Sequence, residues 1–394
     1  MINLTEQAPA FSLLDRFSSD VVAQAEEVYG TYTPVVLEAL SKPVNTYYIR
    51  CNTLKISATE LRTRLEDKGL RVHTHPALPE ALGIQVDGPF EISPTDLRAV
   101  VDKHTAESVL QGANVYAPGV KKCSSMHTGD RVTVVSEVGD ILGNGTATMN
   151  TTDILTFKKG LAVRIENRRY NSPQIRDLPE FSEGLLYPQS LAAMITSHVL
   201  GPQEGETILD MNCAPGGKLS HLSQLMHTSG KILGLDRNAN KIAQTRRTIT
   251  NLGCSNVTLA IHDSRYVDAD FAEMKPDRVL IDPPCSALGL RPKIYDHTKN
   301  ERVDDLAEYQ RQFVKAGSRA VKRGGVLVYS VCTFTTKECE RVVEFAEAEC
   351  GLHTVEQRPF LGSKGLNVGK SGALCQRFRP DVDEIGYFIA KFIR

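Results

Sequence analysis

The chain has 394 residues, more than one hydrophobic core usually supports, so we expect two or three domains. Hydrophobic residues make up 41% of the chain, which suits folded cores, but no stretch reaches the roughly 18 apolar residues that a membrane span needs. The formal net charge of −1 argues against nucleic-acid binding through overall charge, so such binding would need a local basic patch.

Cysteine usage and the start of the chain indicate the compartment. The nine cysteines are odd in number and include no CxxC pair, so neither a disulfide framework nor a structural zinc site is expected. The first twenty residues have no apolar run behind basic residues, which argues against a secretory signal. We therefore expect a cytoplasmic protein with reduced thiols, no bound metal, no membrane contact and no obligate protein partner.

The first part of the chain predicts two small domains. Residues 1–96 combine a helix-like segment, SATELRTRLEDKG, with a strand-like one, TYYIRCNTL, which predicts an α+β region of RRM-like type. Residues 97–170 contain the strand-like runs VTVVSEV and LAVRIE, turn signals at GD and GNG, and little helical periodicity after Leu110. This second segment predicts an inserted, mainly β domain.

One basic cluster lies in and just after this insert. Six basic residues fall within 19 positions that include a single acidic residue, Glu166. Such a cluster can attract phosphate, and the alternative is a solvated basic strip on the surface. The six residues are Lys158, Lys159, Arg164, Arg168, Arg169 and Arg176.

From about Gly205 onward, short apolar runs alternate with longer amphipathic segments. The strand-like runs are ETILDM, KILGLD, NVTLAI, DRVLID and GVLVYS, and the chain ends on another, IGYFIAKFI. This alternation predicts βαβ units in a mostly parallel, doubly wound sheet with helices on both faces. We assign residues 171–394 to this α/β domain, with residues 171–204 linking to the N-terminal region or completing it.

The segment TILDMNCAPGGKLSHLSQL predicts a buried strand up to Asp210, a loop of small residues, and a helix from near Lys218. The backbone N–H groups of such a loop can approach a polar ligand closely. The loop is neither GxGxxG nor GxxxxGK[ST], because Asn212 replaces the first glycine and Leu219 follows the lysine. A nucleotide-like ligand held by shape and by a ribose contact is consistent with it.

Two aspartates follow the next two predicted strands. Asp236 ends KILGLD, about 20 positions beyond the glycine loop, where a carboxylate can bind both ribose hydroxyls. Asp263 follows the third strand and could receive an adenine amino group. Either aspartate alone is more often a helix cap. Together they favour a cofactor that contains adenosine.

The fourth and fifth predicted strands each deliver a cysteine. Asp282 and Cys285 lie in IDPPCSALG, and Cys332 lies near the end of GVLVYSVCTF. Ligands of open α/β sheets bind at the carboxyl ends of the strands, so both cysteines are expected to face the cofactor cleft. Either cysteine alone is more often inert packing. The Asp-Pro-Pro-Cys context and the second cysteine together favour catalysis.

Two thiols and a carboxylate suit methylation at C5 of cytosine. C5 is a poor nucleophile until a thiolate adds at C6 and creates an enamine, which can attack an electrophilic methyl group. An acid protonates N3, and a base later removes the C5 proton. Asp282 suits the N3 contact, one cysteine the addition and the other the release. Lys218 and a helix N-terminus could lower the pKa of a thiol.

Five motifs carry a resemblance to a known family: NCAPGGK (212–218), LDR (235–237), HDS (262–264), DPPCSALG (282–289) and Cys332-Thr333. From Tyr187 onward the chain resembles the Nop2/Sun family of RNA cytosine-5 methyltransferases. The resemblance implies a Rossmann-like class I methyltransferase fold, S-adenosylmethionine as cofactor, Cys332 as nucleophile and Cys285 in product release. The implied cofactor-binding residues are Asn212, Cys213, Ala214, Pro215, Gly216, Gly217, Lys218, Asp236, Arg237, Asp263 and Asp282.

The insert is similar to the PUA domain of one subgroup, the NSUN-six-like tRNA methyltransferases, through GANVYAPGV, GDRVTVVS, LGNGTA and KKGLAVRIENRRYNSP. That similarity implies a PUA domain over residues 97–170 that binds the acceptor stem and 3′-CCA end of tRNA, with cytosine 72 as the target. Tyr116 could stack on a base, or could be a half-buried aromatic residue closing a β-barrel. Candidate basic contacts are Lys121, Lys122, Lys158, Lys159, Arg168 and Arg169.

The chain departs from the family pattern at two places. Asn212-Cys213 replaces Cys-Ala in the usual loop CAAPGGK, and Ala287 stands where glycine is common. Two other functions stay open: an rRNA cytosine-5 methyltransferase, and a non-catalytic RNA-binding or assembly factor. The intact Cys332 and Cys285 argue against the second.

Overall fold

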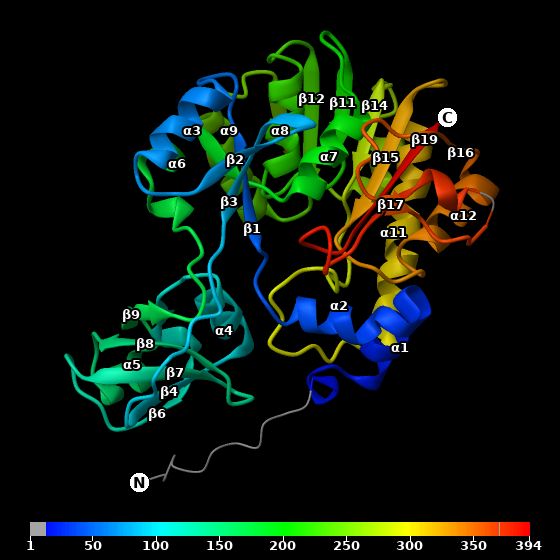
Figure 1. The fold of residues 1–394 in the computed structure, drawn as a ribbon. Coiled ribbons are helices and arrows are strands. Elements are labelled where there is room, and N and C mark those ends of the chain that lie inside the picture. Colours follow the sequence, from blue (N-terminus) through cyan, green and yellow to red (C-terminus); the bar gives the residue numbers. More distant parts are fainter. Residues whose placement is uncertain (1–12, 370) are drawn as a thin grey trace.

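Three β-sheets organise the chain (Figure 1). The computed structural model describes residues 13–369 and 371–394. Within these residues the sheets have nine, six and four strands. None of the helices in this part of the chain is both long enough and apolar enough to cross a bilayer. All nine cysteines are free thiols.

The nine-stranded sheet is the centre of the C-terminal domain. Its strands are β11 (Thr207–Asp210), β12 (Lys231–Asp236), β13 (Val257–Ile261), β14 (Arg278–Ile281), β15 (Val326–Val331), β16 (His353–Thr354), β17 (Ser363–Lys364), β18 (Gln376–Phe378) and β19 (Tyr387–Ile393). The order is β13-β12-β11-β14-β15-β19-β18-β17, and β16 pairs with β19. β11 to β15 are parallel, whereas β19 runs antiparallel to β15 and β18. The connection 379–386 before β19 is too short for a parallel crossover to β18.

Helices cover both faces of this sheet. They are α7 (Leu191–Leu200), α8 (Gly217–Leu225) and α9 (Ala239–Leu252) on one face, and α10 (Val267–Asp270), α11 (Asn300–Ala320) and α12 (Glu340–Cys350) on the other. Successive strand residues point to opposite faces, so Ile208 packs in the first layer and Leu209 in the second. This doubly wound arrangement confirms the predicted fold class.

The six-stranded sheet lies in the insert that begins near residue 97. Its elements are β4 (Leu97–Val101), α4 (Lys103–Leu110), β5 (Val115–Tyr116), β6 (Val120–Cys123), β7 (Arg131–Ser136), β8 (Ile141–Ala147), α5 (Thr151–Phe157) and β9 (Leu161–Arg168). The strand order is β5-β9-β8-β7-β4-β6. The sequence did not predict α5, because this helix has seven residues and buries only Ile154, which gives no helical period.

The structure divides the region predicted as one N-terminal α+β domain. Its elements are α1 (Ser19–Tyr29), α2 (Thr33–Leu40), β1 (Thr46–Cys51), α3 (Ala58–Glu66), β2 (Val72–His75) and β3 (Leu78–Gln85), joined later by α6 (Pro179–Ser182) and β10 (Leu186–Pro188). The four-stranded sheet has the order β10-β1-β3-β2. α1 and α2 pack instead on the C-terminal domain, because Val36 and Leu40 share a buried cluster with Leu288 and Phe334. Residues 1–12 of this region lie outside the described residues.

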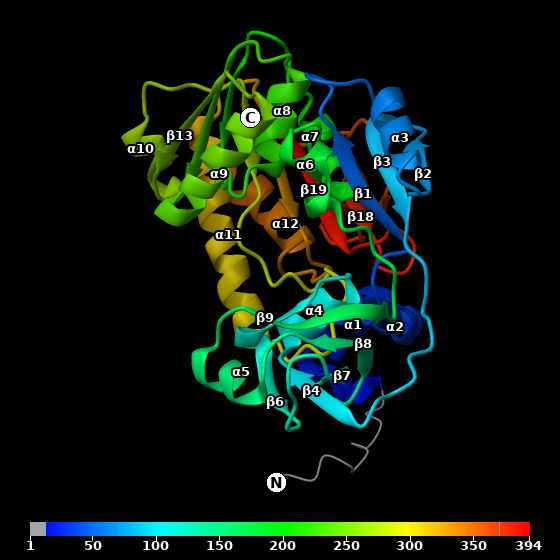
Figure 2. The same cartoon turned by 90° about the vertical axis from the view of Figure 1, so that its left-hand side faces the viewer.

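One loop of the C-terminal domain reaches the six-stranded domain. The loop follows Cys285 and occupies residues 286–299, before α11. Its Leu288 packs with α2, and its Ile294 enters the buried core of the six-stranded domain. Lys103 Nζ of that domain lies 3.6 Å from Oδ2 of Asp296. Figure 2 shows the six-stranded domain at one end of the molecule, with α1 and α2 beside it.

Candidate active site

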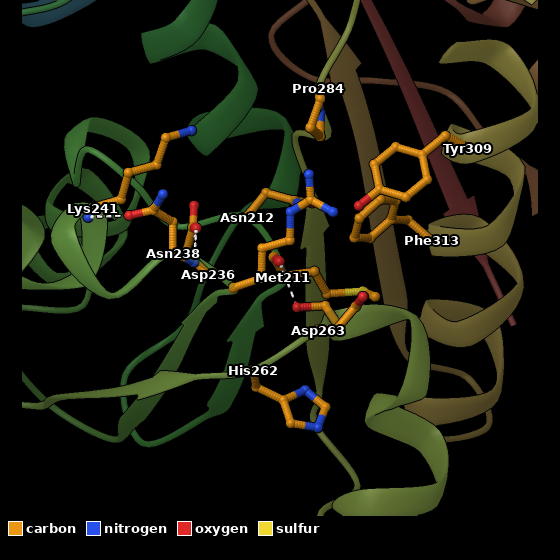
Figure 3. A pocket seen from close by; sticks show the side chains of 12 residues that line it. Met211, Asn212, Asp236, Asn238, Lys241, His262, Asp263, Pro284, Tyr309 and Phe313 are labelled. Atoms are coloured by element: carbon orange, nitrogen blue, oxygen red, sulfur yellow. Dashed lines mark hydrogen bonds between the residues drawn. The ribbon is translucent and has the colours of Figure 1, made fainter. Parts of the chain in front are cut away.

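A cavity lies at the carboxyl ends of β11, β12 and β13. Its volume is about 140 Å³. Figure 3 shows Asp236 and Asn238 on one side of the cavity and the rings of Tyr309 and Phe313, from α11, on the other. Polar groups that face aromatic rings suit a flat ligand with a polar edge, such as a nucleoside. The lining residues are Met211, Asn212, Asp236, Arg237, Asn238, Lys241, His262, Asp263, Ser264, Pro284, Tyr309 and Phe313.

The glycine loop turns the chain from β11 into α8. Gly216 is the N-cap of α8 and has a φ of +105°, a conformation that favours glycine. A Cβ on Gly217 would lie 3.0 Å from the ring of Tyr187, so a larger residue would crowd this contact. Asn212 lines the cavity, whereas Cys213 is buried beneath the loop. The remaining predicted loop residues lie outside the lining, and they are Ala214, Pro215, Gly216, Gly217 and Lys218.

The two aspartates predicted to bind the cofactor line the cavity with different partners. Oδ1 of Asp236 accepts the N–H of Asn238 at 2.8 Å, and the carboxylate keeps further acceptor capacity. Asp263 forms a two-point ion pair with Arg265, with Nε–Oδ1 at 2.9 Å and Nη2–Oδ2 at 2.6 Å. These hydrogen bonds lower the pKa of Asp263 below its ordinary value. Arg237, from the LDR motif, also lines the cavity.

The aromatic wall of the cavity was not predicted from the sequence. Tyr309 and Phe313 lie four positions apart on α11, so both point from one face of the helix. The side chain of Arg265 lies over the Tyr309 ring, 4.9 Å from its centroid. The spacing of Tyr309 and Phe313 was visible in the sequence, but it did not reveal that this face covers a cavity.

The predicted cysteine pair meets at the ends of β14 and β15. The Sγ atoms of Cys285 and Cys332 lie 3.3 Å apart, and both side chains are partly exposed. The hydrogen bond between the thiols lowers the pKa of Cys332 and raises the pKa of Cys285. Cys332 is therefore the thiol that ionises more readily and the better nucleophile of the two.

Asp282 lies beside the thiols in a network of donors. Lys218 Nζ donates to Oδ2 of Asp282 at 2.7 Å, and Ser330 Oγ donates to Oδ1 at 2.9 Å. The hydroxyl of Tyr387 also donates to Oδ1, at 3.3 Å. Burial opposes the charge of Lys218, but Asp282 and Tyr387 hold the pKa of Lys218 above its ordinary value. Ser330 and Tyr387 were not predicted, although Ser330 lies two positions before Cys332.

A buried glutamate ties the two cysteine loops together. Glu338 is fully buried, and its Oε2 accepts the hydroxyls of Ser286 at 2.6 Å and Thr335 at 3.0 Å. Its Oε1 accepts the backbone N–H of Ser286 at 2.8 Å and Nε2 of Gln310 at 2.9 Å. Because Ser286 follows Cys285 and Thr335 lies close after Cys332, this carboxylate fixes the distance between the loops. No motif in the sequence indicated this role for Glu338.

The basic residues predicted to contact RNA fall into two groups. Lys158 Nζ, Arg168 Nε and Arg169 Nη1 each donate to a backbone carbonyl, at 2.7, 3.1 and 3.3 Å respectively. These hydrogen bonds lie within the six-stranded domain, so the three side chains support its structure. The predicted lysines that are exposed without such a bond are Lys121, Lys122 and Lys159.

Two exposed aromatic residues lie on the same domain. Tyr116 is 59% exposed, which excludes the alternative of a half-buried ring that closes the barrel. Phe157, at the end of α5, is 68% exposed and was not predicted. Large apolar side chains with this exposure, next to lysines, are typical of surfaces on which bases stack.

One cluster outside the cavity has the composition of a metal site. The ligand atoms of Glu80, His198 and His221 lie within 4.8 Å of one another. Both histidines are hydrogen-bonded to the glutamate: Nε2 of His198 lies 2.5 Å and Nε2 of His221 lies 3.2 Å from Oε1 of Glu80. Burial lowers the pKa of His221 to about 3, so this ring is neutral. The cluster links β3 to α7 and α8 through hydrogen bonds.

The doubly wound sheet, the cavity lined by Asp236, Asp263 and Tyr309, and the paired thiols define the class of the protein as an S-adenosylmethionine-dependent methyltransferase. Residues 197–393 match the family described as 16S rRNA methyltransferase RsmB/F, and residues 98–168 match the PUA domain. The chain belongs to the RsmB/F (Nop2/Sun) family of RNA methyltransferases and carries a PUA domain.

Relatives match nearly the whole chain. The tRNA (cytosine(72)-C(5))-methyltransferase of Pyrococcus horikoshii is 37% identical over 388 residues, which cover 97% of this chain and 98% of that protein. The human tRNA (cytosine(72)-C(5))-methyltransferase NSUN6 is 31% identical, covering 94% and 92%. The crystal structure of NSun6 from P. horikoshii with SFG, a cofactor analogue, has a TM-score of 0.90 and 36% identity, covering 96% of this chain and 99% of that one.

Ala287 adopts a backbone conformation that favours glycine. Its φ is +56°, in the left-handed region, which explains why glycine is common at this position. We expect Ala287→Gly to raise the free energy of unfolding by about 0.5–1 kcal/mol, because the relief of strain exceeds the added entropy of the unfolded chain. Urea denaturation measures this change. Ala23→Gly, at an exposed position in α1, is the control and should lower the free energy of unfolding by about 1 kcal/mol.

Asp236 provides the clearest test of the cofactor cavity. We expect Asp236→Ala to weaken S-adenosylmethionine binding by about 1.5–3 kcal/mol, because charge-assisted hydrogen bonds to the ribose are lost. Isothermal titration calorimetry measures the dissociation constant. Asp268→Ala, which removes a carboxylate paired with Arg319 outside the cavity, should leave it unchanged. If Asp236→Ala leaves the dissociation constant for S-adenosylmethionine unaltered, Asp236 only caps the backbone of Asn238 and does not bind the cofactor.

Proposed function

We propose that this protein is an S-adenosylmethionine-dependent tRNA methyltransferase that forms 5-methylcytosine at position 72 of the acceptor stem. The chemistry rests on one observation, the 3.3 Å contact between the thiols of Cys332 and Cys285 beside Asp282. The RNA class and the position rest on relatives that align with nearly the whole chain and are named for this reaction.

In the proposed reaction, Cys332 makes the first bond. Its thiolate adds to C6 of the cytosine, while Asp282 contacts N3 and N3 takes a proton from solvent. Lys218, bound to Asp282, offsets the charge near the ring. When bound, S-adenosylmethionine supplies the electrophilic methyl group that C5 attacks. Pro284 lines the cofactor cavity and Cys285 is the next residue, so the cavity adjoins the thiols.

Cys285 completes the proposed cycle. Once the sulfur of Cys332 is bonded to C6, its negative charge no longer opposes ionisation of Cys285, which then loses its proton to solvent. The Cys285 thiolate takes the C5 proton, the C5–C6 double bond re-forms, and the bond between C6 and sulfur breaks. Cys332 leaves as a thiolate, N3 returns its proton to solvent and Cys285 is again a thiol, so the starting state is restored.

Substitution of the two cysteines should block the reaction at different steps. We expect Cys332→Ala to abolish methyl transfer and to leave the affinity for S-adenosylmethionine nearly unchanged, because the thiolate acts on the base. We expect Cys285→Ala to accumulate a covalent protein–RNA adduct, because the C5 proton is no longer removed. Filter assays of methyl incorporation and denaturing gels measure these outcomes. Substantial turnover by Cys332→Ala would contradict the assignment, and normal turnover without an adduct would remove Cys285 from the mechanism.

The PUA domain supports the proposal of an RNA substrate that ends in a single strand. Tyr116 and Phe157 are exposed, and α5 packs against the turn 117–119 that follows Tyr116. Exposed rings can stack on unpaired bases. The net charge of the chain is close to zero, so the protein as a whole does not attract phosphate. The nearby exposed lysines can contact phosphates locally. We infer that this surface binds the 3′-CCA end of tRNA.

Removal of the 3′-CCA tests the substrate. We expect tRNA without CCA to bind at least tenfold more weakly than intact tRNA, because stacking is worth about 1–3 kcal/mol per base. Tyr116→Ala with Phe157→Ala should lower affinity for intact tRNA in the same way, whereas Tyr266→Ala, at a similarly exposed ring, should not. Equal binding and methylation of trimmed tRNA would exclude recognition of this end. The target would then lie in internal RNA structure, such as that of rRNA, and bisulfite sequencing would locate it.

A further inference from the structure

β1 carries a buried arginine at the boundary between the four-stranded sheet and the C-terminal domain. Arg50 is 1% exposed. Its Nη1 donates to Oε1 of Gln189 at 2.5 Å and to the carbonyl of Gly217 at 2.7 Å, and its Nη2 donates to Oγ of Ser220 at 2.7 Å. Gly217 and Ser220 belong to the first turn of α8. An arginine of the N-terminal sheet therefore holds the start of this helix.

The environment of Arg50 is unfavourable for stability alone. The three hydrogen-bond partners of its guanidinium are neutral, and the guanidinium carbon lies 5.6 Å from the centroid of the Tyr187 ring. Burial lowers the pKa of Arg50 to about 10, so it remains charged at neutral pH. Among residues 13–369 and 371–394, neither its Nε nor the Nε2 of Gln189 has a hydrogen-bond partner. A buried charge with unpaired donors costs free energy that an apolar contact would avoid, which points to a role in the site.

The first turn of α8 also carries Lys218. This residue follows Gly217 directly, and its Nζ donates to Asp282 at 2.7 Å. The hydrogen bond with Cys285 lowers the pKa of Cys332, whereas burial and the charge of Asp282 raise it. The positive charge of Lys218 counters Asp282 and lowers the pKa of Cys332. A displaced first turn would draw the ammonium away from Asp282 and would make Cys332 harder to ionise. Arg50 is thus connected to the nucleophile through one turn of helix.

The same segment also holds the neighbouring helix. Asn52 Nδ2 donates to the carbonyl of Leu252 at 2.9 Å, and Lys55 Nζ donates to the carbonyl of Asn251 at 2.7 Å. Both carbonyls lie at the end of α9. Lys55 therefore contributes to the same domain boundary, and among the described residues it has no hydrogen bond to α8. It provides a matched control for Arg50.

We propose that Arg50 is a positioning residue for methyl transfer, which holds the first turn of α8 so that Lys218 stays against Asp282. The proposal rests on the proposed function, because that function gives the Lys218–Asp282 pair its role. Arg50 lies in the domain boundary and acts on the reacting base only through α8.

The test compares Arg50→Met, Arg50→Lys, Ser220→Ala and the control Lys55→Met. The rate of Cys332 alkylation by iodoacetamide is followed against pH by peptide mass spectrometry, without RNA or cofactor. Single-turnover methyl transfer is then measured at saturating tRNA and S-adenosylmethionine, and urea denaturation reports folding. Alkylation isolates the state of the Cys332 thiol from substrate binding.

Arg50→Met should move the alkylation midpoint of Cys332 to higher pH by about one unit, because Lys218 no longer lies against Asp282. Its single-turnover rate should fall at least tenfold. Arg50→Lys keeps the charge and should be intermediate, and Ser220→Ala should shift the midpoint in the same direction by less. Lys55→Met should change the stability and leave both the midpoint and the rate in place.

An alkylation profile of folded Arg50→Met that matches the unaltered protein would overturn the proposal, as would equal losses of rate in Arg50→Met and Lys55→Met. If Arg50→Met does not fold, the alkylation profiles of Arg50→Lys and Ser220→Ala provide the test, and profiles that match the unaltered protein would overturn the proposal. If the unaltered protein does not methylate tRNA, the proposed function fails. The alkylation profiles would still decide whether Arg50 positions Lys218.

Discussion

The ion pair between Lys218 and Asp282 joins the two halves of the proposed catalytic site. Lys218 comes from the start of α8 and Asp282 from the end of β14, and their charged atoms lie 2.7 Å apart. A partly buried pair loses hydration, so it depends on good geometry and on further hydrogen bonds. Ser330 and Tyr387 supply those bonds to Asp282. The cofactor loop and the cysteine loops are therefore held in one arrangement.

The sheet separates binding from chemistry. β11, β12 and β13 end at the cofactor cavity, while β14 and β15 end at the thiols. The antiparallel β19 lies next to β15 and begins with Tyr387, so the last strand also contributes to the site. Glu338 accepts hydrogen bonds from Ser286, which follows Cys285, and from Thr335, which lies close after Cys332, so it holds these two loops together. The close contact of two thiols thus depends on a carboxylate that takes no part in the proposed reaction.

The smaller domains contact the same elements from outside. The four-stranded sheet binds the first turn of α8 through Arg50, and the loop after Cys285 extends into the core of the PUA domain through Ile294. The parts proposed to bind RNA are therefore continuous with the parts proposed to act on the base. α1 and α2 pack on Leu288 of the same loop and not on the N-terminal sheet.

The sequence by itself determined the doubly wound sheet and the placement of Asp236, Asp282, Cys285 and Cys332 at strand ends. Apolar periodicity and strand–loop–helix order are local signals, and the carboxyl ends of parallel strands meet at one edge. Only the tertiary structure decided the partners of these residues. Glu338, Tyr387 and Arg50 meet their partners across domains or distant segments, so no local pattern reveals them. Lys158 is a further example. Its basic cluster predicted a contact with RNA phosphate, but in the folded domain its Nζ donates to a backbone carbonyl of the same domain.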